Sequence, residues 1–171
     1  MKKSSAEISK QLQNVGIFDF EEKYAAEILQ IQTESDLSIW SKNDYLNELD
    51  REDSIFKIAQ NADGKIIGFA LVRLLIGNSN FSENSFDSSE ILNIAVRKSF
   101  QKKGIGQMIF DAILKSLKKK NIKEIWLEVR ASNANAIAFY QKNGFELQFE
   151  RKNYYRNPSE NALILRCSIN L

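Results

Sequence analysis

Histidine is absent from this sequence, and cysteine and proline each occur once among its 171 residues. A chain without histidine has no Ser-His-Asp triad, no histidine general base and no histidine-ligated metal. The single cysteine, Cys167, can form neither an internal disulfide nor a thiolate metal cage. We therefore expect no bound metal, and we expect any proton transfer to use a carboxylate, lysine, tyrosine or water.

Long hydrophobic runs and a large net charge are missing as well. No apolar run approaches the ~20 residues that a membrane-spanning helix needs. The opening stretch, MKKSSAEISKQLQN, lacks the apolar centre of a signal peptide. The net charge of +2 is too small to indicate a nucleic-acid partner. Cys167 suits a small buried side chain in a reducing compartment. These features predict a cytoplasmic protein that binds neither DNA nor a membrane.

The chain length suits one domain with a core of its own, and 43% of the residues are hydrophobic. We assign residues 1–17 to a polar extension and residues 18–171 to a single domain. For the first half of that domain, the apolar spacing and the Asp63-Gly64 turn signal predict the following elements in order: a helix over 21–33, a short helix over 42–49, a hairpin of strands 54–60 and 65–75, and a polar loop over 77–89 with Phe81 and Phe86 as anchors.

The second half has the pattern of a parallel crossover, in which a helix connects two strands of one sheet. The predicted elements are a strand over 90–97, an amphipathic helix over 106–121, a strand over 123–129, a helix over 134–143, and strands over 145–152 and 161–169. Ser132 or Asn133 could cap the 134–143 helix, and Asn143-Gly144 could end it. The sequence therefore predicts an α/β (α+β) fold with a mixed sheet.

A glycine turn, QKKGIGQ (101–107), separates the first crossover strand from its helix. Glycine permits positive φ and close approach of a ligand, and the first-turn N–H groups of the following helix favour phosphate. Lys102 and Lys103 add positive charge there. A tight turn with solvated lysines explains the same residues. The spacing fits neither a dinucleotide fingerprint nor a Walker loop, because Ile109 stands where the third glycine of the fingerprint belongs.

The pattern Gln101-x-x-Gly104-x-Gly106 resembles the pyrophosphate-binding loop of the GNAT superfamily of acetyl-CoA-dependent N-acetyltransferases. Three stretches, LNIAVRKSFQKKGIGQ, WLEVRASNANAIAFYQKNGF and RKNYY, look very like the RimI type, the ribosomal-protein-alanine N-acetyltransferases. The similarity covers about residues 90–156, whereas residues 18–75 agree only in layout. The resemblance implies a GNAT fold, with a mostly antiparallel sheet, one parallel crossover and helices on both faces. It also implies acetyl-CoA as cosubstrate and a protein N-terminus, that of a ribosomal protein, as acceptor.

The resemblance also implies roles for particular positions. Glu128 matches the general base and Tyr140 the general acid that protonates the departing thiolate. The CoA-binding positions are the backbone of Ile94, Ala95 and Val96 for the pantetheine arm, the loop of Gln101, Lys102, Lys103, Gly104, Ile105, Gly106 and Gln107 for the pyrophosphate, and Asn133. Trp40 and Tyr154 match positions near the acceptor.

The residues alone leave other interpretations open. Glu128 could be a solvated carboxylate or a partner of Arg130 on the same strand face. Tyr140 could be a core tyrosine, and Asn133 only a helix cap. Two charged sets could be solvated helix faces or binding surfaces for CoA, RNA or a basic peptide: Lys115 and Lys118–Lys120, and the acidic residues Asp36, Asp44, Glu48, Asp50, Glu52 and Asp53. A lysine side chain or small amine as acceptor, and a non-catalytic CoA-binding module, also stay open.

Overall fold

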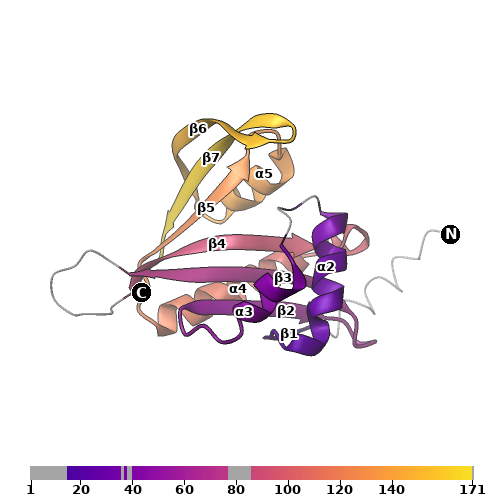
Figure 1. Cartoon of the computed structure of the whole chain (residues 1–171). Coiled ribbons are helices and arrows are strands. Elements are labelled where there is room, and N and C mark those ends of the chain that lie inside the picture. Colours follow the sequence, from indigo (N-terminus) through magenta and orange to yellow (C-terminus); the bar gives the residue numbers. More distant parts are fainter. Residues whose placement is uncertain (1–14, 36, 38–39, 77–85, 171) are drawn as a thin grey trace. The chain divides into compact units, whose positions relative to one another are not determined.

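The computed structural model describes residues 15–35, 37, 40–76 and 86–170 (Figure 1). The polar extension up to residue 14, Asp36 and the loop segment 77–85 with Phe81 lie outside the described residues. No helix in the described part of the chain is long and apolar enough to cross a membrane.

The strands form one seven-stranded sheet in the order β1-β2-β3-β4-β5-β7-β6. Their bounds are β1 Gly16–Asp19, β2 Ser54–Gln60, β3 Ile66–Ile76, β4 Phe86–Val96, β5 Glu124–Arg130, β6 Glu146–Arg156 and β7 Ser159–Ser168. β4 and β5 are parallel and are connected by α4, which confirms the predicted crossover. The sheet is otherwise mostly antiparallel, as expected. The helices are η1 Glu22–Tyr24, α2 Ala25–Glu34, α3 Lys42–Asn47, η2 Lys98–Phe100, α4 Ile105–Lys119 and α5 Ala134–Lys142.

The chain divides into two compact units, each with its own core. Unit 1 comprises residues 1–72 and 93–115, and unit 2 comprises residues 73–92 and 116–171. In unit 1, helices cover both faces of the sheet. Gly68 and Phe69 are neighbours on β3, so they point to opposite faces. A Cβ atom at Gly68 would lie 2.9 Å from Ile109 Cδ1 of α4. On the other face, the Phe69 ring meets Tyr45 of α3 edge-on, with 5.9 Å between the ring centroids.

In unit 2, α5 covers one face of β5, β7 and β6. Along β5 the side chains alternate, with Ile125, Leu127 and Val129 buried and the intervening residues half-buried. Ile125 pairs with Cys167 of β7, and Cys167 Sγ donates to Asn143 O at the end of α5 over 3.5 Å. The buried residues of β5 therefore face α5, and the half-buried ones line the opposite face. Cys167 is half-buried, so the prediction of a buried cysteine is only partly correct.

Several elements differ from the prediction. Residues 86–89 belong to β4 and not to a loop, because Ser88 and Ser89 pair with Glu124 and Ile125 of β5. β1 was not predicted, and it begins at Gly16, inside the segment assigned to the extension; its pairing with β2 places Ile17 opposite Ala59. The helix predicted over 42–49 ends at Asn47, and β6 runs four residues further than expected, to Arg156.

Candidate active site

The loop between β4 and α4 is shaped by two residues with positive φ. Gly104 has φ of +84°, and a Cβ atom there would have no heavy atom within 4 Å. Lys102 has φ of +57°, a conformation that few non-glycine residues adopt. The carbonyl of Gly104 accepts from Met108 N over 3.0 Å, so the first turn of α4 begins directly after it. Gly106 lies inside α4, so of the two glycines only Gly104 supplies the predicted positive φ.

Side chains of the loop brace its backbone. Gln101 Nε2 donates to Val96 O over 2.9 Å, which connects the loop to the end of β4. Lys103 Nζ donates to Ser99 O over 2.6 Å and lies 5.2 Å from the centre of the Phe100 ring. The backbone of Gly104 is thus exposed and uncovered beside a helix start, with lysines at positions 102 and 103. These features suit a pyrophosphate group.

The predicted pantetheine-binding strand segment, Ile94–Val96, lies at the end of β4. The pairs between β4 and β5 run from Ser88 and Glu124 to Ile91 and Leu127, so the three residues lie beyond the last pair. Ala95 is buried, and Ile94 and Val96 are half-buried. One of their carbonyls, that of Val96, is already bonded to Gln101.

Glu128 lies on the face of β5 opposite α5, together with Trp126, as predicted. Its side chain is 21% exposed. It forms an ion pair with Arg151 of β6, and interaction with its carboxylate raises the pKa of the Tyr154 phenol. The cross-strand register brings β6 to this face, because Glu128 pairs with Ile164 of β7 and Ile164 pairs with Phe149 of β6. The predicted sites Glu128 and Tyr154 therefore lie close enough to interact.

Arg130 is not the partner of Glu128. It forms an ion pair with Glu160 (3.1 Å), and its guanidinium lies 4.1 Å from the centre of the Tyr155 ring. Glu160 also accepts from Ser132 N, and its pKa is lowered first by the Ser132 side chain and then by this backbone hydrogen bond. Arg130 thus fixes the strand end from which α5 departs.

Tyr140 and Asn133 lie on α5, and no hydrogen bond or ion pair joins either of these two described residues to Glu128. Asn133 Oδ1 accepts from Ala136 N over 3.2 Å, so it caps the helix, as one interpretation of the sequence expected. Tyr140 is 6% exposed and packs against Phe145, with 5.4 Å between ring centroids. Burial raises the pKa of Tyr140, and the phenol therefore keeps its proton at neutral pH.

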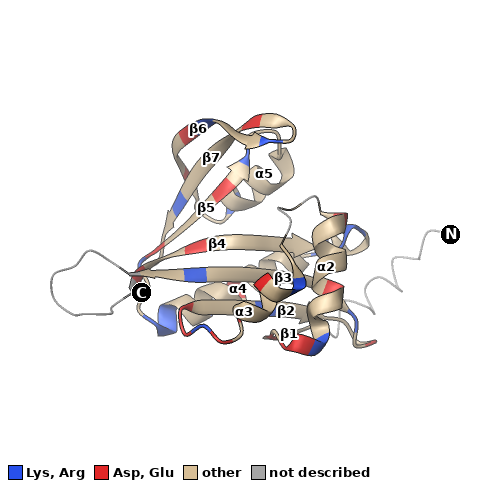
Figure 2. Cartoon of the chain, viewed as in Figure 1, with Lys and Arg blue, Asp and Glu red and all other residues tan. Residues whose placement is uncertain are grey.

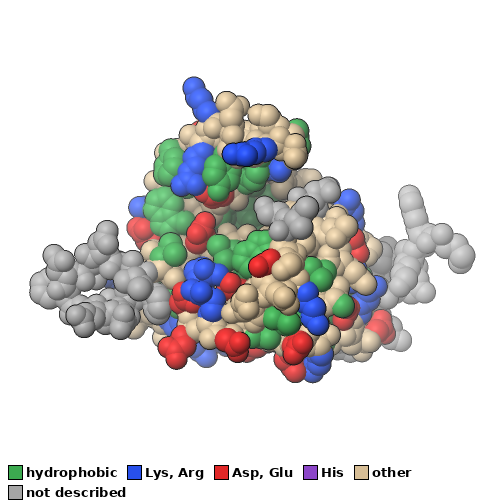
Figure 3. Space-filling model, in the orientation of Figure 1, with side chains coloured by type: hydrophobic (Ala, Val, Ile, Leu, Met, Phe, Trp, Pro, Cys, Tyr) green, Lys and Arg blue, Asp and Glu red, His purple; other side chains and the backbone are tan. Residues whose placement is uncertain are grey.

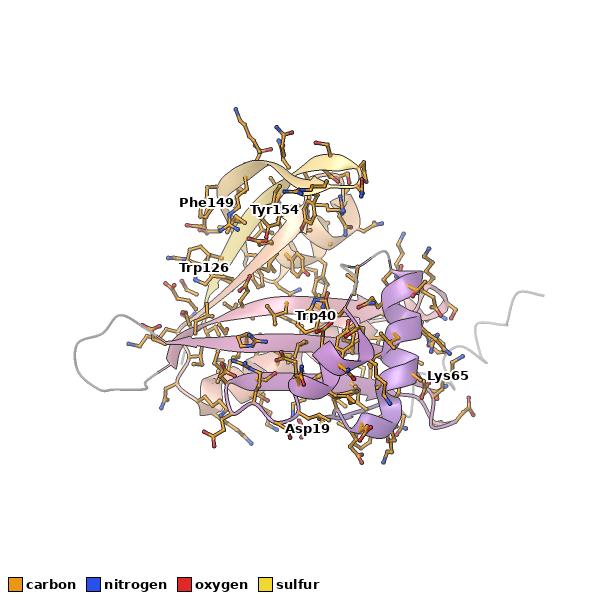
Figure 4. The ribbon with its side chains drawn as sticks, viewed as in Figure 1. Asp19, Trp40, Lys65, Trp126, Phe149 and Tyr154 are labelled. Carbon is orange, nitrogen blue, oxygen red and sulfur yellow. The ribbon has the colours of Figure 1, made fainter. Side chains whose placement is uncertain are left out.

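Trp40 belongs to unit 1, where Gln32 of α2 and Tyr45 of α3 fix its position. Both backbone polar groups of Trp40 bond the Gln32 side chain, and the Trp40 and Tyr45 ring centroids lie 5.3 Å apart. Figure 4 labels Trp40 in unit 1, and in unit 2 it labels Trp126, Phe149 and Tyr154, which line the face that carries Glu128. Hydrophobic side chains lie next to Lys and Arg on that face of unit 2 (Figure 3). Phe149 and Tyr154 are 48% and 45% exposed.

The surrounding charges are unevenly distributed. Glu90 of β4 pairs with Trp126, and its pKa is raised by burial and by the charge of Glu128. Lysines gather at the C-terminal end of α4, where they suit the helix dipole (Figure 2). Of the acidic residues in the front segment, Glu48 is buried, so the solvated-face interpretation is wrong for Glu48. Asp44 is exposed, and its side chain accepts from Ser41 N at the start of α3. The described residues contain no cluster of three or more side chains that could hold a metal ion.

Three residues were not identified from the sequence: Arg151 and Glu90 in unit 2, and Gln32 in unit 1. Arg151 stands in the RKNYY stretch, but its meeting with Glu128 depends on the register of three strands. Glu90 was assigned to a strand, but the alternation of side chains along that strand did not predict that Glu90 would lie near Glu128. Gln32 lies within the predicted helix, where a glutamine gives no local signal of a contact eight residues away.

Two known proteins are similar to this chain over most of its length. A [ribosomal protein bS18]-alanine N-acetyltransferase of Escherichia coli K12 is 31% identical over 134 residues, which make up 77% of this chain and 82% of that protein. The Haemophilus influenzae protein of the same name is 32% identical over 152 residues, or 87% and 92% of the two chains.

Solved structures have the same fold. The crystal structure of the Escherichia coli ribosomal-protein-S18-alanine N-acetyltransferase superposes with a TM-score of 0.77 at 27% identity and covers 92% of this chain and 95% of its own. Arabidopsis thaliana NAA60 in complex with acetyl-CoA gives 0.80 at 15% identity, over 92% and 100% of the two chains, which shows the fold alone. Residues 25–145 match the acetyltransferase (GNAT) family. The chain therefore belongs to the GNAT family and is an acetyl-CoA-dependent N-acetyltransferase.

Proposed function

We propose that this enzyme transfers the acetyl group of acetyl-CoA to the α-amine of a protein N-terminus, and that the acceptor is the N-terminal alanine of a small-subunit ribosomal protein. The observation that carries the proposal is Glu128. It is a carboxylate on the face of β5 opposite α5, only partly exposed, next to exposed aromatic side chains that a peptide could contact. The names of the relatives at 31% and 32% identity support the choice of acceptor.

In the proposed reaction, the neutral amine attacks the thioester carbonyl directly. Glu128 takes the proton that the amine loses, and Tyr140 protonates the sulfur of the departing CoA. The reference pKa of an α-amine is about 7.7–8.0, against ~10.4 for lysine, so deprotonating lysine at neutral pH costs roughly 3.4 kcal/mol more. A carboxylate base is therefore better matched to an α-amine than to a lysine side chain.

The remaining roles concern acetyl-CoA itself. We propose that the backbone of Lys102–Gln107, with Gln101 bracing it, binds the pyrophosphate, and that Ile94–Val96 bind the pantetheine arm through their backbone. Asn133 would contact CoA as well as cap α5. Trp40 and Tyr154 would contact the acceptor. The exposed, uncovered backbone at Gly104 supports the first assignment.

The acceptor is tested with acetyl-CoA and four peptides, three of which begin with Ala, Ser or Met, while the fourth has a lysine and a blocked N-terminus. We expect the Ala peptide to be acetylated fastest, as measured by thiol release and by the mass of the product. Acetylation of the blocked peptide alone would overturn the α-amine assignment. Absence of turnover with every peptide, despite tight CoA binding, would indicate a non-catalytic CoA-binding module.

The base is tested with Glu128→Gln. We expect a fall of about 100-fold or more in kcat, with little change in the Kd of acetyl-CoA. Glu124→Gln is the matched control, because Glu124 lies on the same face of β5, is half-buried, and pairs with Arg166 over 3.2 Å. Equal losses of turnover and CoA binding in Glu128→Gln would mean that Glu128 has a structural role.

A further inference from the structure

The ion pair between Glu128 and Arg151 places a permanent cation on the proposed base. Arg151 Nη1 contacts Glu128 Oε1 directly. The guanidinium carbon of Arg151 lies 5.4 Å from the centre of the Tyr154 ring and 5.9 Å from that of Phe149. The arginine is therefore positioned by its carboxylate partner and by two aromatic neighbours, although its side chain is 48% exposed.

Several ionisable groups lie around Glu128. On the pKa values of two of them, Arg151 has the opposite effect to Glu128. The charge of Glu128 raises the pKa of Glu90, and the charge of Arg151 lowers it. Arg151 also lowers the pKa of Tyr154, against the raising effect of Glu128. The charged and titratable groups around Glu128 are Glu90 of β4, Arg73 of β3, Arg130 and Glu124 of β5, Arg166 of β7, and Arg151, Tyr154 and Tyr155 of β6. Of the four arginines, Arg151 is the one paired with Glu128.

This pairing conflicts with the proposed proton transfer unless Arg151 moves. A guanidinium stays protonated at all ordinary pH values, so Arg151 can neither accept the proton nor supply one. An amine that approaches Oε1 of Glu128 meets the guanidinium that is bound there.

We propose that Arg151 is a positioning residue for Glu128, a resident counter-ion that holds the carboxylate in its orientation until the acceptor amine takes its place. The inference depends on the proposed role of Glu128. When the amine nitrogen approaches Glu128, the guanidinium leaves Oε1 and remains against Phe149 and Tyr154. The amine proton then passes to a carboxylate that no longer faces a cation. Arg151 therefore competes with the acceptor amine for Glu128.

The test compares Arg151→Gln with Arg151→Lys and Lys152→Gln in steady-state kinetics across pH. Lys152→Gln is the matched control, because it removes the same charge from the next residue of the same exposed strand. In Arg151→Gln we expect the KM of the acceptor peptide to fall several-fold. Arg151→Lys retains the charge and should keep the KM of the acceptor near its wild-type value, as should Lys152→Gln.

Two results would overturn the inference. An acceptor KM that stays unchanged in Arg151→Gln would mean that the arginine does not compete with the acceptor. A KM for the acceptor that rises in Arg151→Gln would mean that Arg151 binds the acceptor and does not compete with it.

A measurement without turnover separates this inference from the proposed function. Arg151 lowers the pKa of Glu90, so Arg151→Gln should raise the Glu90 pKa, as followed by NMR of its carboxyl carbon. Lys152→Gln should leave it unchanged. If Glu90 responds in this way while Glu128→Gln retains full activity, the ion pair exists but Glu128 is not the base, and the proposed function fails. If Glu128→Gln is inactive and Glu90 does not respond, the Arg151 inference fails alone.

Discussion

The side chain of Gln32 bonds both backbone polar groups of Trp40. Its Nε2 donates to Trp40 O over 3.1 Å, and its Oε1 accepts from Trp40 N over 3.1 Å. The Tyr45 hydroxyl donates to the same oxygen over 2.7 Å, and Gln32 is 6% exposed. One buried amide thus fixes the backbone position of the tryptophan that we assign to acceptor binding.

Replacing this amide with an apolar side chain of similar shape should affect both stability and acceptor binding. Gln32→Met leaves the Trp40 backbone groups and the Tyr45 hydroxyl without their partner, so we expect the free energy of unfolding to fall by roughly 2–3 kcal/mol. The KM of the acceptor peptide should rise while that of acetyl-CoA stays the same. Thr33→Ala is the control, because it removes an exposed hydrogen bond to Leu29 O from the next residue of α2. An equal rise in both KM values would argue against a specific role of Trp40.

Gly104 and Gly64 have nearly equal φ values, so Gly64→Ala is a control for the backbone strain that Gly104→Ala introduces. Gly104 has φ of +84° and Gly64, in the β2–β3 turn, has φ of +79°. Alanine at either position strains the backbone, so we expect each variant to lose about 1 kcal/mol or more in urea denaturation. Only Gly104→Ala should raise the KM of acetyl-CoA, because its new methyl group enters space that is otherwise open. Equal KM values in the two variants would remove Gly104 from the proposed pyrophosphate site.

Arg97 and Glu34 form an ion pair whose two members are buried to different extents. Their side chains are 6% and 39% exposed, and the Arg97 Nε also donates to Ile66 O over 2.8 Å. Glu34→Ala removes the nearest countercharge of a buried guanidinium, and we expect a loss of roughly 2–3 kcal/mol. Adding Arg97→Met removes the buried charge, so the double variant should be more stable than Glu34→Ala. Chemical denaturation of the single and double variants measures the difference, and an additive further loss would contradict this account.

The parts of the fold that depend on local signals were predicted from the sequence. The crossover from β4 through α4 to β5, the Asp63-Gly64 turn and the capped helix α5 all follow from short-range patterns of apolar, glycine and capping residues. β1 and residues 86–89 were missed because their strand structure comes from pairing with distant segments. Ser88 and Ser89 resemble a loop until Glu124 and Ile125 lie beside them.

In the candidate site, too, local patterns were predicted and contacts between distant segments were missed. Alternation along β5 was enough to place Glu128 on a face with Trp126, but its partner could not be predicted. Arg130 was the nearest arginine on that face in the sequence, whereas Arg151 comes from a strand two positions across the sheet. Side-chain contacts of this kind depend on register, and a bulge between Leu147 and Phe149 shifts the register of β6.

Two buried tyrosines should make the protein sensitive to alkali. Burial raises the pKa of both Tyr45 and Tyr140, and each is at most 6% exposed. In the unfolded chain both phenols lose their protons near pH 10, whereas in the folded protein both keep them to higher pH. Above pH 10 the unfolded state therefore binds fewer protons than the folded state, so stability falls as pH rises. Each tyrosine should contribute about 1.4 kcal/mol per pH unit to that fall.

The variants Tyr140→Phe and Tyr45→Phe separate the two contributions. Tyr140→Phe keeps the ring against Phe145, so near pH 7 we expect only a small change in the free energy of unfolding. Above pH 10 the stability of this variant should fall less steeply than that of the wild type, by about 1.4 kcal/mol per unit. Tyr45→Phe should flatten the slope similarly, but it should also lose stability at neutral pH, because its hydroxyl donates to Gln32. A wild-type slope in both variants would mean that other groups cause the alkaline loss.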